Sequence, residues 1–256
     1  MEGSAGLTLT VIGAGPAWSD RPGSSGASYL VRTGSTAVLL DLGQGSFPRL
    51  IRAIEPSELD AVVVSHLHPD HFIDLVPLRH YLAYQHVPAR SVRVIAPDGL
   101  ADRIDALHAQ PGFTAVSLRL EPFAAEPVRI GDLILEARRV RHTENSHAVR
   151  IGRDGGPGLV YSGDCGAAAD LAPLIRPGDA LLVEVSFGAG AVPTGSLHLN
   201  AAAVAELAVA AKPGRVLLTH LQMALDRVAP VEIVRAATGG PVQLVEPGDV
   251  IDLSRT

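Results

Sequence analysis

Residues 65–71 read Ser65-His66-Leu67-His68-Pro69-Asp70-His71. Three histidines and an aspartate therefore lie within six residues, directly after the apolar run Ala61–Ser65, which predicts a short buried strand. His66 and His68 are two residues apart, so both side chains can leave an extended strand end on the same side. Pro69 then turns the chain, which returns the aspartate and the third histidine toward the same space. Imidazole and carboxylate groups together suit zinc, iron or manganese, so the segment predicts a metal site.

The alternative is a polar loop that holds several histidines by chance. The chain has ten histidines in 256 residues, which makes so dense a cluster improbable by accident. A catalytic zinc ion takes about three protein ligands plus water, so a single ion does not use all these groups comfortably.

Further candidate ligands follow other apolar runs that predict strands. His142 follows Leu133–Val140, Asp164 follows the run that ends at Gly163, and His220 follows Thr219. Each is weak evidence alone, because a lone histidine is more often a surface or core residue, and Asp164 could begin a turn or cap a helix. Ligand-type residues at four strand ends are stronger evidence, because such ends converge where α/β folds build their sites.

Composition limits the class of protein. The chain is 47% hydrophobic and 19% charged, which is typical of a globular protein and excludes disorder. The length of 256 residues fits one large domain, so we expect residues 1–256 to form a single domain. The formal charge of −6 offers no general attraction for nucleic acid. A single cysteine, Cys165, excludes an intrachain disulfide and a multi-cysteine zinc site.

The first six residues lack the basic start and apolar run of a signal peptide. No apolar stretch reaches the ~20 residues that span a bilayer. We therefore expect a cytoplasmic protein with no membrane contact.

The order of predicted elements indicates two mixed sheets with helices outside them. Gly13-Ala14-Gly15 after the first predicted strand suggests a dinucleotide fingerprint, but Trp18 stands where the third glycine belongs and argues against it. The remaining predicted strands and helices are strands at 7–12, 29–32, 37–41, 61–65, 92–96, 117–120, 133–139, 149–151, 159–162, 181–184, 216–219, 242–245 and 250–253, and helices at 47–54, 75–84, 99–109, 200–210 and 230–236.

These motifs together resemble the metallo-β-lactamase superfamily. The resemblance rests on the HxHxDH segment at 66–71, on His142, Asp164 and His220 in the family's order, and on Asp41-Leu42-Gly43-Gln44-Gly45 as its first motif. It extends from about residue 7 to residue 253. It implies an α/β fold, the four-layer αββα sandwich, with two divalent metal ions at one edge of the sheets; zinc is the first choice, and manganese or iron are alternatives.

The resemblance also implies a ligand set. One ion would take His66, His68 and His142; the other would take Asp70, His71 and His220; Asp164 would bridge them. A hydroxide that bridges the ions would attack the substrate, and Asp70 would also be catalytic by orienting or shuttling a proton. Lactam-hydrolysing members often use a cysteine ligand, whereas Cys165 is one place after Asp164, so we treat it as a buried non-ligand.

Within the superfamily, the sequence resembles ribonuclease Z and cyclic-nucleotide phosphodiesterases. Ser196-Leu197-His198-Leu199-Asn200 carries this likeness, and it implies that His198 contacts the scissile phosphate as a catalytic and substrate-binding residue. His198 could instead be an ordinary residue before a helix that Asn200 caps. Ribonuclease Z carries a long tRNA-gripping arm, but the 22 positions from His142 to Asp164 leave no room for one. We therefore expect a small phosphodiester substrate and not tRNA; a homodimer is implied only by the resemblance.

Two features near the predicted site stay open. His147 could bind substrate or be a solvated turn residue. The Gly/Ala-rich loop 188–195 precedes His198 and could act as a lid.

Two alternatives to a phosphodiesterase also remain. One is an ester, thioester or lactam hydrolase on the same metals. The other is a non-catalytic member of the fold that binds a ligand.

Overall fold

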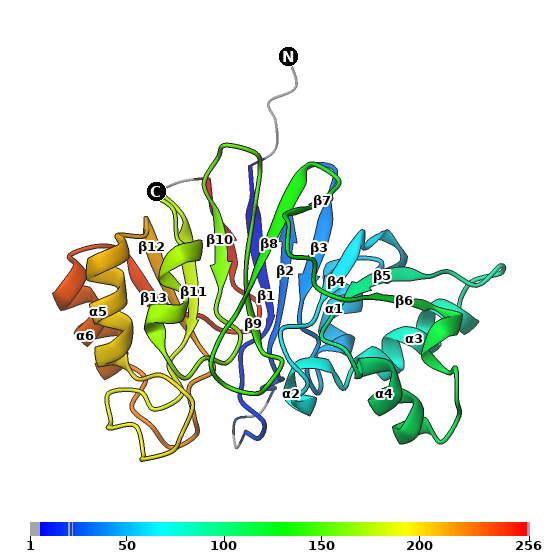
Figure 1. The fold of residues 1–256 in the computed structure, drawn as a ribbon, viewed down its shortest axis with the longest axis horizontal. Helices are drawn as coiled ribbons and strands as arrows, with labels where there is room; N and C mark the ends of the chain where they lie inside the picture. Colours follow the sequence, from blue (N-terminus) through cyan, green and yellow to red (C-terminus); the bar gives the residue numbers. More distant parts are fainter. Residues whose placement is uncertain (1–5, 20, 22, 255–256) are drawn as a thin grey trace.

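The computed structural model describes residues 6–19, 21 and 23–254. Two seven-stranded sheets form its centre, with strand orders β14-β1-β2-β3-β4-β5-β6 and β13-β12-β11-β10-β9-β8-β7 (Figure 1). The strands are β1 Thr8–Gly13, β2 Ser28–Arg32, β3 Ala37–Leu40, β4 Ala61–Val63, β5 Val92–Ile95, β6 Leu118–Glu121, β7 Val128–Ile130, β8 Leu133–Arg139, β9 His147–Gly152, β10 Gly158–Tyr161, β11 Ala180–Glu184, β12 Arg215–Thr219, β13 Val242–Leu244 and β14 Val250–Asp252.

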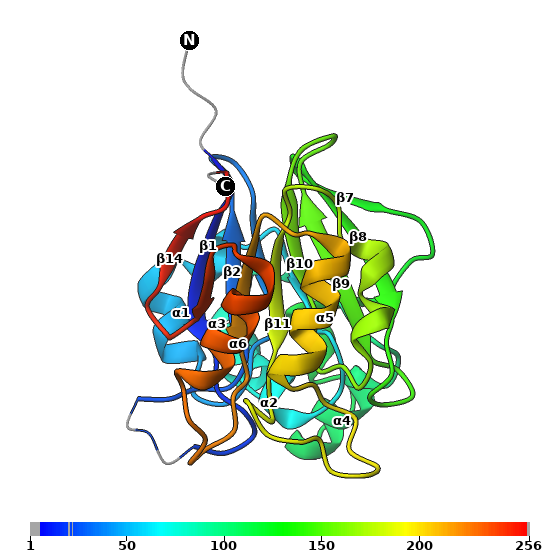
Figure 2. The same ribbon diagram turned by 90° about the vertical axis from the view of Figure 1, so that its left-hand side faces the viewer.

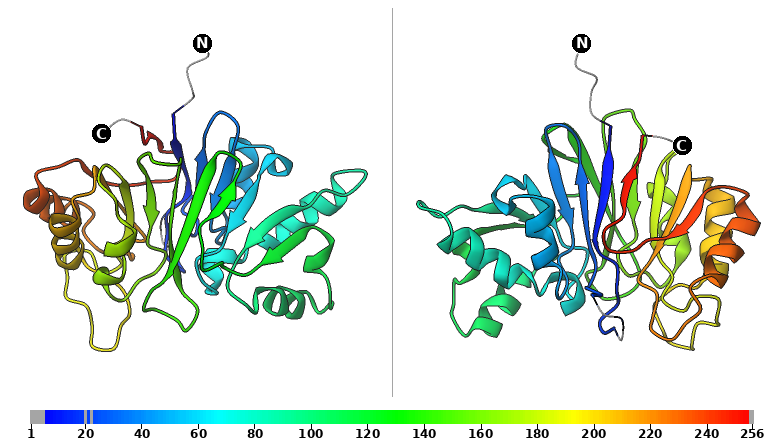
Figure 3. Two further views of the ribbon diagram at one scale, coloured as in Figure 1. Left: turned by 45° about the horizontal axis from the view of Figure 1, so that its top comes forward. Right: turned by 180° about the vertical axis from the view of Figure 1, so that it is seen from behind.

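Helices cover the two outer faces of this pair of sheets (Figures 1, 2 and 3). The α-helices are α1 Phe47–Ala53, α2 Pro69–Phe72, α3 Leu75–Tyr84, α4 Leu100–His108, α5 Ala201–Ala211 and α6 Ala229–Thr238. Short 3-10 helices span Pro56–Glu58, Thr114–Val116, Ala168–Asp170 and Ala172–Leu174. None of the helices formed by the described residues combines the length and the apolar character that crossing a bilayer requires.

The alternation of side chains along each strand explains the layers. In β2, Tyr29 and Val31 pack in the core between the two sheets, while Leu30 packs in the core beneath α1, α3 and α4. In β11, Leu182 faces the core between the sheets, while Leu181 and Val183 pack beneath α5 and α6. Successive side chains of a strand point to opposite faces, so strands buried on both faces are apolar throughout. The expected four-layer αββα sandwich is confirmed.

Most predicted elements occur within a residue or two of their expected bounds; one strand, one α-helix and the short 3-10 helices were not predicted. The strand β7 has three residues and, among the described strands, pairs only with β8. The helix α2 has four residues and begins at Pro69. Both are too short for hydrophobic periodicity to identify them. The predicted helix at 200–210 begins one residue later, because the side chain of Asn200 caps it by accepting from Ala203 N at 3.0 Å.

A buried ion pair ties β9 to the start of β11. Arg150 is 1% exposed, and its guanidinium donates to both carboxylate oxygens of Asp179 at 2.8 and 2.9 Å. The same carboxylate accepts the backbone N–H groups of Gly158 and Arg176. Asp179→Ala would leave the buried Arg150 charge with only the longer 3.7 Å contact to Glu136, so we expect the free energy of unfolding to fall by about 3 kcal/mol in denaturant titrations.

The control for this prediction is the exposed pair of Arg141 and Asp170, in which the arginine side chain is 65% exposed. Solvent screens such a pair, so Asp170→Ala should cost at most about 1 kcal/mol. Equal losses in the two variants would contradict the importance assigned to the buried pair.

Candidate metal centre

The predicted ligands meet at one edge of the sandwich, beside α2 at the lower edge of Figure 1. His66 lies after β4, His142 after β8, Asp164 after β10 and His220 after β12. The strands β8, β10 and β12 run in one direction, because β9 is antiparallel to both β8 and β10, and β10, β11 and β12 are parallel. Their carboxyl ends therefore deliver side chains to the same edge.

The side chains form two groups that share Asp164. The ligand atoms of each group lie within 4.8 Å of one another; the groups are His66, His68, His142 and Asp164, and Asp70, His71, Asp164 and His220. Oδ2 of Asp164 is 3.7 Å from His66 Nε2 and 3.6 Å from His142 Nε2. Oδ1 of Asp164 is 3.3 Å from His71 Nε2 and 3.5 Å from His220 Nε2. One carboxylate thus presents one oxygen to each group.

The donor groups fit metal ions. Four ligands at about 2.0–2.1 Å from a tetrahedral Zn²⁺ lie about 3.3–3.4 Å from one another, which is close to the distances around Asp164. Three buried polar atoms at this point, His66 Nε2, His71 Nε2 and Asp164 Oδ1, have no hydrogen-bond partner among the described residues. Buried polar groups are rarely left unpaired, so a cation between them accounts for both observations.

The opposite ring nitrogens of four histidines have hydrogen-bond partners, and for His66 the partner of Nδ1 is the Ser65 hydroxyl at 3.1 Å. His71 Nδ1 donates to Asp41 Oδ2 at 2.7 Å, and His142 Nδ1 donates to the carbonyl of Leu197 at 2.8 Å. His220 Nδ1 lies 3.1 Å from the hydroxyl of Ser186. Because an imidazole that donates from Nδ1 keeps its lone pair on Nε2, the contacts to Asp41 and Leu197 set those rings in the form that binds a metal.

Asp41 organises the group that contains His71. This aspartate is fully buried, and its carboxylate also accepts from the backbone N–H of Ser65 at 2.6 Å, the Ser65 hydroxyl at 2.7 Å and the Tyr161 hydroxyl at 2.7 Å. Its backbone has a positive φ of 57°, and His220 has one of 56°. Such conformations are uncommon for residues other than glycine and cluster at functional sites. The motif at 41–45 marked this aspartate in the sequence, but nothing there indicated its contacts.

Burial and neighbouring charges determine the protonation of these side chains. Burial, reinforced by the neighbouring histidines, lowers the pKa of His66, and burial also lowers the pKa values of His68 and His142. These three rings are therefore neutral, as metal ligands must be. Burial opposes a negative charge on Asp164, but the nearby His220 and His71 outweigh it and hold the pKa of this carboxyl well below its usual range. Asp164 is therefore a carboxylate.

His198 lies beside both groups and is paired with a buried glutamate. Its ring centroid is 4.6 Å from that of His142 and 6.0 Å from that of His220. His198 Nδ1 donates to Glu184 Oε1 at 2.9 Å. Burial opposes the charge on His198, but the hydrogen bond to Glu184 and its charge outweigh burial and raise the pKa of His198. Within the described part of the chain, no hydrogen bond occupies the opposite nitrogen, Nε2.

Glu184 was not predicted as a functional residue. It is fully buried at the end of β11 and also accepts from the backbone N–H groups of Cys165 and Ser186, at 3.0 and 3.1 Å. Glu184 ends an apolar strand, and its separation of fourteen positions from His198 matches no sequence motif. The position of Glu184 inside an otherwise apolar run was the only available sign.

The remaining predicted residues lie around the centre. Cys165 is buried, and burial raises the pKa of its thiol to about 12; it belongs to none of the donor groups. His147 also lies outside those groups: its ring stacks on Phe123 with centroids 4.2 Å apart and lines a cavity of about 170 Å³. Its substrate contact stays a prediction.

The loop 188–195 is anchored to the start of α5. Gly188 O accepts from Ala201 N at 2.8 Å, and Gly190 O accepts from the Asn200 side chain at 2.8 Å. Motion of this loop as a lid stays a prediction.

Comparison with known proteins agrees with this geometry. Residues 36–221 match the family described as "Beta-lactamase superfamily domain". The chain is 30% identical over 239 residues to the uncharacterised protein ML1173 of Mycobacterium leprae (strain TN), which covers 91% of this chain and 84% of that protein. It is 26% identical over 220 residues to the probable metallo-hydrolase YhfI of Bacillus subtilis (strain 168), covering 84% of this chain and 87% of that one.

A solved structure and a further relative complete the comparison. The crystal structure of the metallo-β-lactamase fold protein YhfI from Bacillus subtilis has a TM-score of 0.85 at 24% identity, covering 96% of this chain and 99% of that chain. Ribonuclease Z of Mycobacterium marinum (strain ATCC BAA-535 / M) is 32% identical over 104 residues, which covers 40% of this chain and 37% of that enzyme. With the match over 36–221, the chain belongs to the β-lactamase superfamily, and it has the metallo-β-lactamase fold.

Proposed function

We propose that this protein is a metallo-hydrolase, a dinuclear phosphodiesterase that acts on a small phosphodiester such as a cyclic nucleotide. The observation that carries the proposal is the pair of Glu184 and His198 beside the two donor groups. A proton donor at this position suits a reaction in which a poor leaving group, an alkoxide, departs from phosphorus.

The proposed ligand sets follow the two groups around Asp164. His66, His68 and His142 would hold one ion, and Asp70, His71 and His220 the other, with Asp164 shared. Zinc is the first choice of metal, and manganese or iron also accept these ligands. Bound there, two divalent cations would lower the pKa of a water molecule toward neutrality and neutralise charge on phosphate oxygens.

The residues of the chain itself supply orientation and a proton. Glu184 fixes the His198 ring through Nδ1, which leaves Nε2 to donate a proton to the departing oxygen. The raised pKa of His198 favours the protonated form that such a donor needs. A thiol has a pKa of only about 8.5, so the thiolate that leaves from a thioester is a weak base. Hydrolysis of a thioester therefore needs a proton donor less than the departure of an alkoxide does.

The size of the substrate is inferred from the interval between His142 and Asp164. The segment between these two residues folds into the β9–β10 hairpin and carries no inserted arm. The acidic chain offers little general attraction for a long polyanion. The relative named ribonuclease Z is consistent with cleavage of phosphodiesters, and the interval favours a smaller substrate than tRNA.

A substrate panel tests the proposal. Protein loaded with Zn²⁺ or Mn²⁺ should hydrolyse bis-p-nitrophenyl phosphate and cyclic nucleotides, and should leave thioesters and nitrocefin largely intact. Turnover of thioesters or nitrocefin with silent phosphodiesters would favour the ester, thioester or lactam alternative. A full metal content with no activity on any substrate would favour a non-catalytic binding protein.

Asp41→Asn should weaken metal binding without removing a ligand. The substitution keeps the size of the side chain, but it removes the negative charge that accepts the His71 Nδ1 proton. Partners of this kind typically change metal affinity by about 10–100-fold, so we expect a loss of that size in competition titrations with a metal chelator.

The matched control is Asp74→Asn, which changes a half-buried carboxylate that accepts from the backbone N–H of Phe47 and contacts no ligand histidine. Its metal affinity should stay at the level of the unmodified protein. The same affinity loss in both variants would mean that Asp41 acts through general stability and not through His71.

A further inference from the structure

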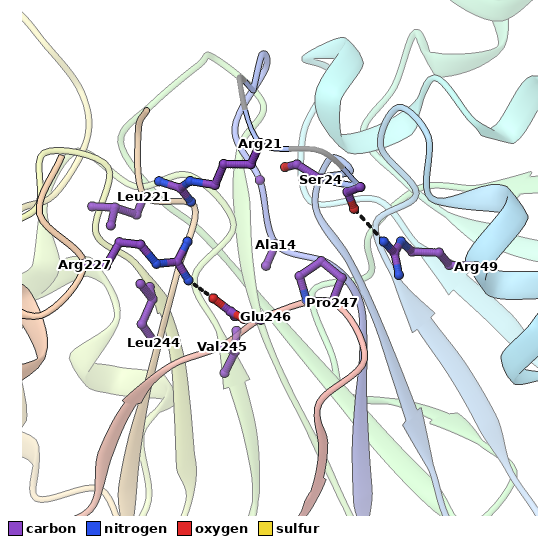
Figure 4. A pocket seen from close by; sticks show the side chains of 12 residues that line it. Ala14, Arg21, Ser24, Arg49, Leu221, Arg227, Leu244, Val245, Glu246 and Pro247 are labelled. Atoms are coloured by element: carbon purple, nitrogen blue, oxygen red, sulfur yellow. Dashed lines mark hydrogen bonds and ion pairs between the residues drawn. The ribbon is translucent and has the colours of Figure 1, made fainter. Parts of the chain in front are cut away.

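A cavity of about 220 Å³ lies next to the metal centre but is lined by none of its ligands. Its wall includes Ala14 after β1, Leu221 after β12 and Val245 after β13. Figure 4 shows side chains that line it. The backbone N–H of His220 donates to the carbonyl of Ala14 at 3.1 Å, so the wall of the cavity adjoins the backbone of a predicted ligand.

Three arginines from distant parts of the sequence line this cavity: Arg21, Arg49 of α1, and Arg227 before α6 (Figure 4). The carboxylate among the lining residues is that of Glu246, which forms an ion pair with Arg227. Arg49 donates to the carbonyl of Gly23 at 2.6 Å, which leaves its charge uncompensated. No ion pair joins Arg21 or Arg49 to any residue that the structure describes. The cavity is therefore positive in a chain whose formal charge is −6.

Arg21 and Arg227 repel each other. Burial lowers the pKa of Arg227, and the nearby charge of Arg21 lowers it further. Like charges in one cavity destabilise the protein unless a counter-charge occupies the space between them. A bound anion would provide that counter-charge.

We propose that this cavity binds a phosphate or diphosphate group of a small molecule, at a site separate from the metal centre. Guanidinium groups present parallel N–H donors that match phosphate oxygens. Arg21 and Arg227 lie together on one side of the cavity and Arg49 lies on the other, so a diphosphate placed between them would face donors at both ends. The cavity is smaller than the roughly 300–1,000 Å³ of pockets that enclose a whole ligand, so it fits the phosphate end of a molecule. The site goes beyond the proposed function, because it uses none of the metal ligands.

The number of binding sites tests the proposal, because the metal centre also attracts phosphate. In calorimetric titrations of the metal-loaded protein, we expect pyrophosphate to occupy two sites. The double variant Arg49→Gln/Arg227→Gln should weaken one of these sites at least about tenfold and leave the other unchanged. Arg52→Gln removes an exposed arginine from the same helix, α1, and should retain both sites.

Inorganic phosphate and adenosine 5′-monophosphate distinguish two sources of the phosphate group. Tighter binding of the nucleotide at the arginine site would identify a phosphorylated metabolite, and equal binding would identify free phosphate. An unchanged number of sites and unchanged affinity in the double variant would overturn the proposal. A protein that binds no phosphate at its metals but loses its remaining site in this variant would contradict only the proposed function.

A variant that gains affinity excludes misfolding as the explanation. Glu246→Gln removes the carboxylate that competes for Arg227, and the Glu246 side chain is 59% exposed, so the change should be tolerated. We expect pyrophosphate to bind the arginine site about three- to tenfold more tightly, because Arg227 is released toward the cavity. Unchanged or weaker binding at that site would overturn the proposal.

Discussion

Purified Asp164→Ala protein is expected to contain one metal ion per chain or none, where the proposed dinuclear site predicts about two in the unmodified protein. The reason is that both donor groups include this carboxylate: Oδ2 faces His66 and His142, and Oδ1 faces His71 and His220. Loss of Asp164 also removes a negative charge that would offset two divalent cations in a buried site. Elemental analysis of the protein after gel filtration measures the effect.

Two further variants show whether the carboxylate is shared. Asp70 belongs to only one donor group, so Asp70→Ala should remove one ion and keep the other. Asp170 lies outside both groups and pairs with Arg141, so Asp170→Asn should keep the full content. Two metal ions per chain in Asp164→Ala would mean that Asp164 is not shared. The same conclusion would follow if Asp164→Ala lost no more metal than Asp70→Ala and kept its activity.

The fold and the donor groups could be predicted from the sequence because each depends on a short stretch of residues. The HxHxDH segment at 66–71 is conspicuous by composition, and His142, Asp164 and His220 each follow an apolar run. Strand ends on one edge of a sheet converge, so position along the chain already implied proximity in space.

The roles of the residues that orient the ligands could not be predicted from the sequence, because these roles depend on contacts between distant parts of the chain. Tyr161 reaches Asp41 from the other sheet, across 120 positions in sequence. Glu184 reaches His198 over a loop, and no periodicity encodes the length of that loop. The cavity of Arg21, Arg49 and Arg227 likewise assembles from residues that have no pattern in the sequence, because surface arginines are common and usually solvated.

Replacing His198 by alanine should leave the metal content unchanged and lower kcat on a phosphodiester by about 10²–10⁴-fold, the usual contribution of a positioned proton donor. His198 Nδ1 is occupied by Glu184, and the ring belongs to neither group around Asp164; it lies in a third group, with Glu184 and His220. His108→Ala, which removes an exposed histidine at the end of α4, is the control and should keep full activity. Metal loss in His198→Ala would instead make His198 a ligand or a structural residue.

Glu184→Gln tests how His198 is tuned, because Glu184 acts through the histidine as a positioning residue. In the unmodified protein the glutamate raises the pKa of His198, so the protonated form, and with it kcat, should persist until the pH rises through that raised value. The amide can still hold the ring but carries no charge, so the pKa of His198 should fall and the alkaline limb of the pH–kcat profile should move to lower pH. A profile that keeps its alkaline limb, with kcat reduced equally at every pH, would mean that Glu184 supports the fold around Cys165 and Ser186 and does not tune a proton donor.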